Sequence, residues 1–203
     1  MTIIIIGITV TISILAFNKP ELMYKYQFNP YQIIQRKQYV RMFSHALLHS
    51  NWSHLLINML VLFSFGQSLE KHFETVFGSL GIPYYLLLYI IAVLVSPVYS
   101  LIKQRNNYMY NAVGASGAVS AVVFASIFFA PWRQIYFFGV LPIPGIVFAL
   151  AYLLYSWQMS KRNRDNIAHD THLVGALIGL VFPVILNPKL LSYFIDQLTS
   201  FQF

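Results

Sequence analysis

Three short stretches of this chain place polar, chemically capable side chains inside long apolar runs. They are His54 to Asn58, Gly114 to Ser120 and His172 to Gly179. Strongly polar groups inside a hydrocarbon layer cost free energy, so each stretch is a candidate functional site. A serine becomes nucleophilic when a histidine takes its proton, and positioned hydrogen-bond donors stabilise the oxyanion that forms next. Together the three stretches contain the side chains that a serine hydrolase needs.

The stretch NAVGASGAVSA, residues 111–121, has two interpretations. Gly114 and Gly117 lack side-chain bulk, which favours close packing of two membrane helices. They also leave room for the backbone of a substrate beside a reactive serine. Ser116, near the start of the predicted helix, would have a backbone N–H without an intrahelical acceptor. Ser120 lies one turn further on the same face, so the spacing alone leaves both serines open as the nucleophile.

His54 and Asn58 are four residues apart and therefore share one face of a helix. Both side chains can donate hydrogen bonds. They either hold two helices together, at about 1 kcal/mol per bond, or point at a developing oxyanion. His45 and His49 have the same spacing, which would also suit two histidine ligands of a metal ion. A zinc protease motif needs glutamate after the first histidine, and Ala46 stands there, so we predict no metal and no cofactor.

His172, Gly175 and Gly179 form one stripe along a predicted helix. Glycines at this spacing allow the helix to press against a neighbour while an imidazole lies at the contact. His169 lies on nearly the same stripe, whereas Asp170 points away from it. A structural histidine near the membrane surface remains the alternative for either imidazole.

The composition is that of a membrane protein. Of 203 residues, 58% are hydrophobic and only 9% are charged, whereas a soluble domain has about 25% charged residues. The chain has no cysteine, which excludes disulfides and thiolate nucleophiles. The net charge is +7, but basic residues such as Lys161 and Arg162 lie in breaks between apolar runs. This arrangement predicts contact with lipid headgroups and no nucleic-acid partner.

Six apolar segments approach the roughly 17–25 residues that a membrane-spanning helix needs. We expect an all-α membrane protein with a single domain, 1–203, and a retained first helix. The connection over residues 18–51 is rich in Tyr, Phe and Ile, which predicts a structured loop at the membrane interface. The residues after Pro188 predict a helix that lies on the membrane surface. The expected spans are 1–17, 52–69, 80–102, 112–130, 145–157 and 166–186.

The order and spacing of these stretches resemble the rhomboid family of intramembrane serine proteases. Gly114-Ala115-Ser116-Gly117 matches the Gly-x-Ser-Gly motif of the family's nucleophile, which favours Ser116 over Ser120. The His172 stripe matches the family's Ala-His-x-x-Gly-x-x-x-Gly track, except that Thr171 stands where alanine is usual. His54 and Asn58 match the family's His-x-x-x-Asn motif.

The resemblance implies a six-transmembrane-helix rhomboid bundle with a long structured loop between helices 1 and 2. It implies a catalytic dyad of Ser116 and His172, and an oxyanion site of His54, Asn58 and the Ser116 backbone N–H. The activity implied is cleavage of transmembrane segments of other membrane proteins through an acyl-enzyme. We expect the protein to act as a monomer in the cell membrane, among lipids. The residues expected in helix-packing or structural places are Arg41, His45, His49, Glu70, Gly114, Gly117, Gly175 and Gly179.

Two features depart from the family pattern. Many members have an aromatic residue one turn after the serine, packed on the histidine, where this chain has Ser120. The family places the N-terminus inside, yet only Lys71, Arg133 and Lys189 of the 13 basic residues would then lie inside. The positive-inside rule favours the opposite orientation.

Two other functions stay open from the sequence. One is a proteolytically inactive family member that binds membrane proteins, and the other is a small transporter, for which inverted repeats would be expected. For a protease, the loop from Ser160 to Asp165 is the expected movable cap over the site.

Overall fold

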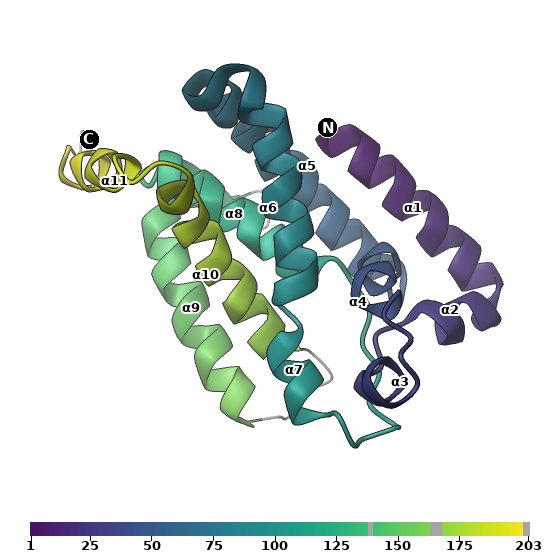
Figure 1. The fold of residues 1–203 in the computed structure, drawn as a ribbon. Coiled ribbons are helices and arrows are strands. Elements are labelled where there is room, and N and C mark those ends of the chain that lie inside the picture. Colours follow the sequence, from purple (N-terminus) through teal and green to yellow (C-terminus); the bar gives the residue numbers. More distant parts are fainter. Residues whose placement is uncertain (138–139, 163–167, 201–203) are drawn as a thin grey trace.

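The computed structural model describes residues 1–137, 140–162 and 168–200, most of which are helical (Figure 1). The helices of the first half are α1 (Thr2–Asn18), α2 (Pro20–Tyr26), α3 (Pro30–Gln35), α4 (Arg41–Ser44), the 3₁₀ turn η1 (His45–Leu47), α5 (Trp52–Phe77) and the 3₁₀ turn η2 (Gly78–Leu80). The remaining elements are α6 (Gly81–Val95), α7 (Val98–Lys103), α8 (Ser116–Phe129), β1 (Gln134–Phe137), β2 (Leu141–Pro144), α9 (Gly145–Arg162), α10 (His169–Leu186) and α11 (Leu190–Thr199).

Helix α8 is the centre of the molecule. Every residue from Gly117 to Phe129 is buried, which requires neighbours on all sides of the helix. Helices α5, α6 and α10 pack against it, and α10 makes the most extensive contact. Figure 1 shows α8 behind α6 and α10, with α1 at the outer edge beside α5. A helix that is apolar all round, as α8 is, belongs in the core of a bundle.

The contact between α8 and α10 depends on glycine. A Cβ placed on Gly175 would lie 2.1 Å from the carbonyl oxygen of Gly117, and one on Gly179 would lie 2.2 Å from that of Ala121. A Cβ on Gly117 would lie 2.2 Å from Ser96 Oγ. Real side chains do not reach such distances, so Gly175 and Gly179 let the backbone of α10 touch that of α8, and Gly117 leaves room for the Ser96 side chain. The packing role expected of the three glycines stays a prediction, which these distances support.

By length and apolarity, two helical stretches of the described chain can cross a membrane, Trp52–Lys103 and His169–Leu186. Helices α1 and α2 would make a third if the pair, bent by 119°, counts as one span. Helix α8 is apolar but shorter than a typical span. The six expected spans therefore remain a prediction.

Helix α5 is longer than expected, because it runs to Phe77 and not to Leu69. The apolar run stops at Leu69, but the following Glu, Lys and His residues are good or acceptable helix formers. The helix ends where Gly78 adopts a φ of +57°. Glu70 therefore lies two turns before the end of α5. Its carboxylate accepts hydrogen bonds from the Met1 ammonium, at 3.0 Å, and from the Thr2 N–H.

Two other expected spans begin or end differently in the structure. The segment 80–102 is broken between α6 and α7, because Pro97 lacks an N–H and cannot continue a helix. The segment 112–130 is helical only from Ser116. Before it, Ala112 pairs as an isolated bridge with Phe28, and Gly114 has a φ of +122° that no helix contains.

The expectation of an all-α protein is wrong at one place, a hairpin of β1 and β2. The two strands are antiparallel, with Ile135 opposite Ile143. Pro142 and Pro144 alternate in β2, and proline both prevents a helix and holds the residue before it extended. Helix α9 starts directly after Pro144, as these prolines predict, and it continues to Arg162, beyond the expected residue 157.

Short helices fill the segment between α1 and α5. Arg41 is buried and donates through Nη1 to the carbonyl oxygens of Tyr24 and Gln27, at 2.9 and 2.8 Å, where α2 ends. His49 is fully buried and its Nδ1 lies 3.0 Å from Ser13 Oγ of α1. The Arg41 bonds hold the segment together, and the His49 contact attaches it to α1. After Pro188, α11 forms the predicted helix.

Changing Gly175 to alanine should destabilise the bundle. The new Cβ would meet the Gly117 backbone, which cannot rotate away, and overpacking of this kind costs about 1–3 kcal/mol or more. Thermal unfolding in detergent micelles measures the effect. Gly7→Ala is the control, because nothing lies within 4 Å of a Cβ on Gly7. Equal melting temperatures for the two variants would contradict this account of the α8–α10 contact.

The protein should lose stability in mild acid. Burial lowers the pKa of His45 to about 4 and that of His49 to about 3, whereas both titrate near 6.5 when unfolded. Below pH 6.5 the unfolded chain binds more protons, so the free energy of unfolding falls as the pH drops toward 4. From about pH 7.5 to pH 5 the loss is roughly 2 kcal/mol per histidine. A melting temperature that stays constant over this range would refute the prediction.

Candidate active site

The structure brings Ser116 and His172 together. His172 Nε2 lies 2.7 Å from Ser116 Oγ, a hydrogen-bond distance, although the residues are 56 positions apart. When the imidazole has its proton on Nδ1, Nε2 is a lone pair that accepts the serine hydroxyl proton. Ser116 is the first residue of α8 and His172 lies in the first turn of α10. The close contact of the two helices sets the distance between the side chains.

Gly114 shapes the turn that leads into Ser116. Its φ of +122° lies in a region that residues with a side chain rarely adopt. Its N–H donates to the carbonyl oxygen of His45 at 3.0 Å, which ties the turn to the segment before α5. A Cβ on Gly114 would lie 2.8 Å from Cε1 and 3.0 Å from Nε2 of His54. The glycine therefore lets the His54 ring approach the nucleophile motif.

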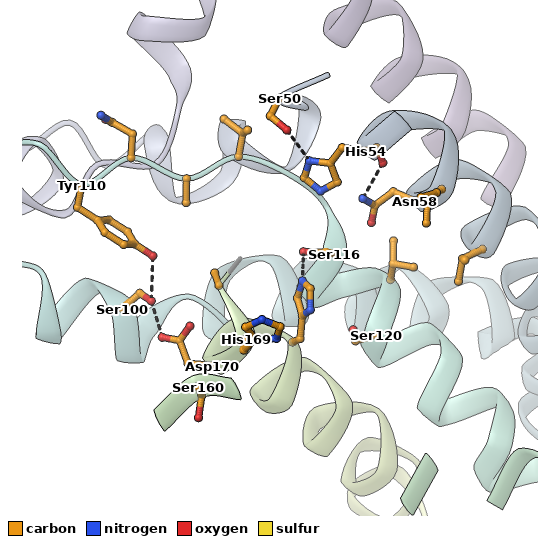
Figure 2. A pocket seen from close by; sticks show the side chains of 18 of the residues that line it. Ser50, His54, Asn58, Ser100, Tyr110, Ser116, Ser120, Ser160, His169 and Asp170 are labelled. Atoms are coloured by element: carbon orange, nitrogen blue, oxygen red, sulfur yellow. Dashed lines mark hydrogen bonds between the residues drawn. The ribbon is translucent and has the colours of Figure 1, made fainter. Parts of the chain in front are cut away.

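His54 and Asn58 lie on one face of α5, next to the Ser116 turn, as their spacing predicts. Figure 2 shows both side chains on the side of the site opposite His169 and Asp170. Asn58 is buried, and its Nδ2 donates to the backbone oxygen of His54 at 3.0 Å. The amide nitrogen has two protons, so one remains for a ligand. The Ser116 N–H, in the first turn of α8, has no intrahelical acceptor.

The side chains described above line one cavity of about 1160 Å³. Its wall has a polar part near the Ser116 turn and an apolar part along α8 and α9 that includes Val119, Val123, Phe124 and Phe148. The four side chains proposed for chemistry all line it: His54, Asn58, Ser116 and His172. Such a cavity can hold an extended backbone next to Ser116 with an apolar side chain against the helices.

Ser120 bonds to a residue of α9. Its Oγ lies 2.8 Å from the hydroxyl oxygen of Tyr152 on α9. The Tyr152 ring packs against Phe124 and Phe148, with ring centres 5.4 and 5.8 Å away. The structure therefore places Ser116, and not Ser120, against His172. An aromatic residue is present near this turn after all, supplied by α9, and no pattern within the α8 sequence could have indicated it.

His169 and Asp170 form the other side of the site. The His169 ring is buried, edge-on to His172 with ring centres 6.0 Å apart, and also edge-on to Tyr155. Asp170 accepts a hydrogen bond from Ser100 Oγ of α7, so it points away from His172 as predicted. This bond ties the start of α10 to α7, a role that the sequence analysis missed.

Tyr110 extends the same network. Its hydroxyl lies 3.4 Å from Ser100 Oγ, and burial raises the pKa of the phenol, so it stays protonated as a donor. Ser100, Tyr110 and Asp170 all line the cavity (Figure 2).

The expected cap lies largely outside the described residues. Ser160 belongs to the last turns of α9 and lines the cavity, while residues 163–167 are not described. In the parts of the chain that the structure describes, no three His, Cys, Asp or Glu side chains are grouped to hold a metal ion. His45 and His49 instead make separate contacts, His45 with the Phe28 ring and His49 with Ser13.

Comparison with known proteins identifies the family. A model of the Rhomboid domain matches residues 36–189, which is most of the chain and includes every residue of the candidate site. This chain belongs to the rhomboid family. Rhomboids are membrane proteins, and the apolar helices of this rhomboid agree with a helical membrane protein.

One relative of this rhomboid is the RHOMBOID-like protein 12, mitochondrial, of Arabidopsis thaliana. The two are 26% identical over 144 residues, which is 67% of this chain and 43% of the relative. The chain thus spans less than half the length of that relative.

Gly114→Ala should reduce both the stability of the protein and turnover at this site. Alanine at this φ costs about 1–3 kcal/mol, and its Cβ would displace the His54 ring. A displacement of about 1 Å in an active site can cost roughly 10²-fold in rate. Cleavage of a transmembrane reporter substrate and thermal unfolding give the two values.

The control for this prediction is Gly78→Ala. Gly78 also has a positive φ, +57°, but nothing lies within 4 Å of its Cβ position. It should lose stability and keep its activity. If both variants lose activity in proportion to their stability, backbone strain alone explains the effect, and the contact with His54 has no part in it.

Proposed function

We propose that this rhomboid is an intramembrane serine endopeptidase that cleaves transmembrane segments of other membrane proteins. The observation that carries the proposal is the 2.7 Å contact between Ser116 Oγ and His172 Nε2. The contact lies in a cavity that His54 and Asn58 also line. A nucleophile, a base and two donors are the groups that acyl transfer requires.

In the first half of the reaction, His172 Nε2 takes the proton of Ser116 Oγ as the oxygen attacks the scissile carbonyl carbon. The carbonyl oxygen becomes an oxyanion. His54 Nε2–H, Asn58 Nδ2–H and the Ser116 N–H donate to it. The C–N bond then breaks, the His172 imidazolium gives its proton to the leaving amine, and the acyl group remains on Ser116.

The second half repeats these steps with water. His172 takes a proton from the water as its oxygen attacks the ester carbonyl, and the same donors stabilise the second oxyanion. The bond between the acyl carbon and Ser116 Oγ breaks, and the imidazolium returns its proton to Ser116 Oγ. No metal or cofactor takes part in this scheme. The polar wall of the cavity, which includes Ser50, Ser100 and Gln104, lets water reach the dyad.

The substrate class follows from the setting of the cavity. Its apolar wall lies along α8 and α9, so a substrate side chain from a membrane helix can be accommodated there. A carbonyl inside an intact helix is hydrogen-bonded and screened by its own turn. The substrate must therefore unwind near the cut, and helix-breaking residues there should increase turnover.

The proposed setting is a multi-pass protein of the cell membrane with six spans, made by α1, α5, α6 with α7, α8, α9 and α10. Helix α8 is short for a span. It is enclosed by other helices, so it does not have to match the thickness of the hydrocarbon layer by itself. Basic residues between the spans contact lipid headgroups. The protein acts as a monomer, because all four proposed groups come from one chain.

Labelling with a fluorophosphonate tests this function. We expect the detergent-solubilised protein to react at Ser116, because only a serine activated by a base attacks the phosphorus readily. Label should appear on the wild type and on Ser120→Ala, and should be absent from Ser116→Ala and His172→Ala. The Ser120 variant is the matched control, since Ser120 lies one turn away and contacts Tyr152.

Absence of label from all four folded proteins would reject the protease and favour an inactive rhomboid that binds membrane proteins. Label that persists on Ser116→Ala would show a different nucleophile. Cleavage of a reporter substrate by the same variants should follow the labelling pattern.

A further inference from the structure

We infer that Ser50 is a positioning residue that fixes the tautomer of His54, so that His54 Nε2–H faces the oxyanion. The inference rests on the proposed protease function and adds a residue to its machinery. The neutral imidazole has one proton, and only the form with the proton on Nε2 can donate toward Ser116. The hydrogen bond at the other nitrogen selects the form that is present.

The network begins at Asn51, the residue that caps α5. Its Oδ1 accepts the backbone N–H of His54 at 2.8 Å, the usual capping bond. This bond fixes the orientation of the amide, because the oxygen must face the N–H. The amide nitrogen therefore points the other way, and Nδ2 donates to Ser50 Oγ at 3.3 Å.

The Ser50 hydroxyl links Asn51 to the His54 ring. Its Oγ lies 3.1 Å from His54 Nδ1. The hydroxyl has a single proton and already accepts from Asn51 on its oxygen. When it donates this proton to Nδ1, both contacts are satisfied and Nδ1 is the unprotonated nitrogen of the ring. The His54 proton is then on Nε2.

The Nε2 edge faces the nucleophile motif. A Cβ on Gly114 would meet Cε1 and Nε2 of His54 first, so this edge of the ring lies against the turn that leads into Ser116. Figure 2 shows His54 between Ser50 on one side and Ser116 on the other. The opposite tautomer would present the Nε2 lone pair to the oxyanion. A lone pair repels negative charge, so His54 would no longer stabilise the oxyanion.

His49 cannot replace Ser50 in this role. Ser13 Oγ donates its proton to the Leu47 carbonyl at 2.9 Å, so it accepts from His49 Nδ1–H. The proton of His49 is therefore on Nδ1 and points to α1, away from His54. The His49 ring lies edge-on to His54, with centres 5.0 Å apart, and serves as packing.

Nitrogen-15 NMR of the protein with labelled histidine gives a direct test. The wild type at about pH 8 should show His54 with a protonated Nε2 and a bare Nδ1, whose resonance lies far downfield. The His54→Gln spectrum identifies the signals. In Ser50→Ala the two tautomers should mix, and in Ser50→Thr the wild-type pattern should return because the hydroxyl is kept.

Kinetics link the tautomer to turnover. Ser50→Ala should lower kcat roughly tenfold, short of the 10²–10³-fold typical for complete loss of an oxyanion donor, and leave KM within about twofold. Ser50→Thr should recover most of kcat. Ser53→Ala is the matched control, because Ser53 is also exposed and adjacent to His54 in sequence but takes no part in these hydrogen bonds. It should keep wild-type kcat and the wild-type spectrum.

The outcomes separate the two proposals. If the wild type neither cleaves nor takes label, the protease function fails, and the spectrum still reports on Ser50. If the wild type cleaves but its His54 proton is on Nδ1, the inference about Ser50 is wrong and the protease stands. The same holds if Ser50→Ala keeps wild-type kcat or an unchanged His54 spectrum.

Discussion

The contact of α10 with α8 at Gly175 and Gly117 is the constraint on which the rest of this molecule depends. The backbone of one helix lies where any side chain on the other would be. Ser116 and His172 each lie within one turn of this contact, so the approach of the helices also sets the 2.7 Å distance between their side chains. Inside a membrane the hydrophobic effect does not drive helices together, so close van der Waals packing must hold α8 against α10. Stability and the proposed chemistry therefore depend on the same glycines.

A second constraint connects this helix pair to α5. The turn at Gly114 is held by the His45 carbonyl, which belongs to the segment before α5, and it lies against the His54 ring. One short turn thus fixes where Ser116 lies relative to His54. The segment that carries His45 is itself attached to α1 through His49 and Ser13. His45 makes its attachment through its backbone carbonyl, and His49 makes its attachment through its buried imidazole.

Much of the candidate site could be predicted from the sequence. Residues three or four apart in a helix lie on one face, so helical spacing in the sequence predicts which side chains are neighbours. This holds for His172 with its two following glycines and for His54 with Asn58. Ser116 stands out because it lies between glycines. Helix ends were less predictable. The apolar run of α5 ends at Leu69, so apolarity did not predict the last two turns, which are rich in charged residues. Pro97 interrupts an apolar run that looks continuous in the sequence. The prolines of β2 belong to a hairpin that apolarity alone did not predict.

The sequence by itself determined the membrane character, the family resemblance and the residues able to do chemistry, because composition and local spacing carry this information. Only the tertiary structure decided which of these residues meet. In the structure, Ser116 lies against His172 and Ser120 bonds to Tyr152. Asp170 accepts a hydrogen bond from Ser100, and Ser50 lies beside His54. All but the last of these contacts join residues on different helices, and even Ser50 needs the turn before α5 to reach His54. Such pairs depend on how helices cross, and no periodicity within one segment encodes that.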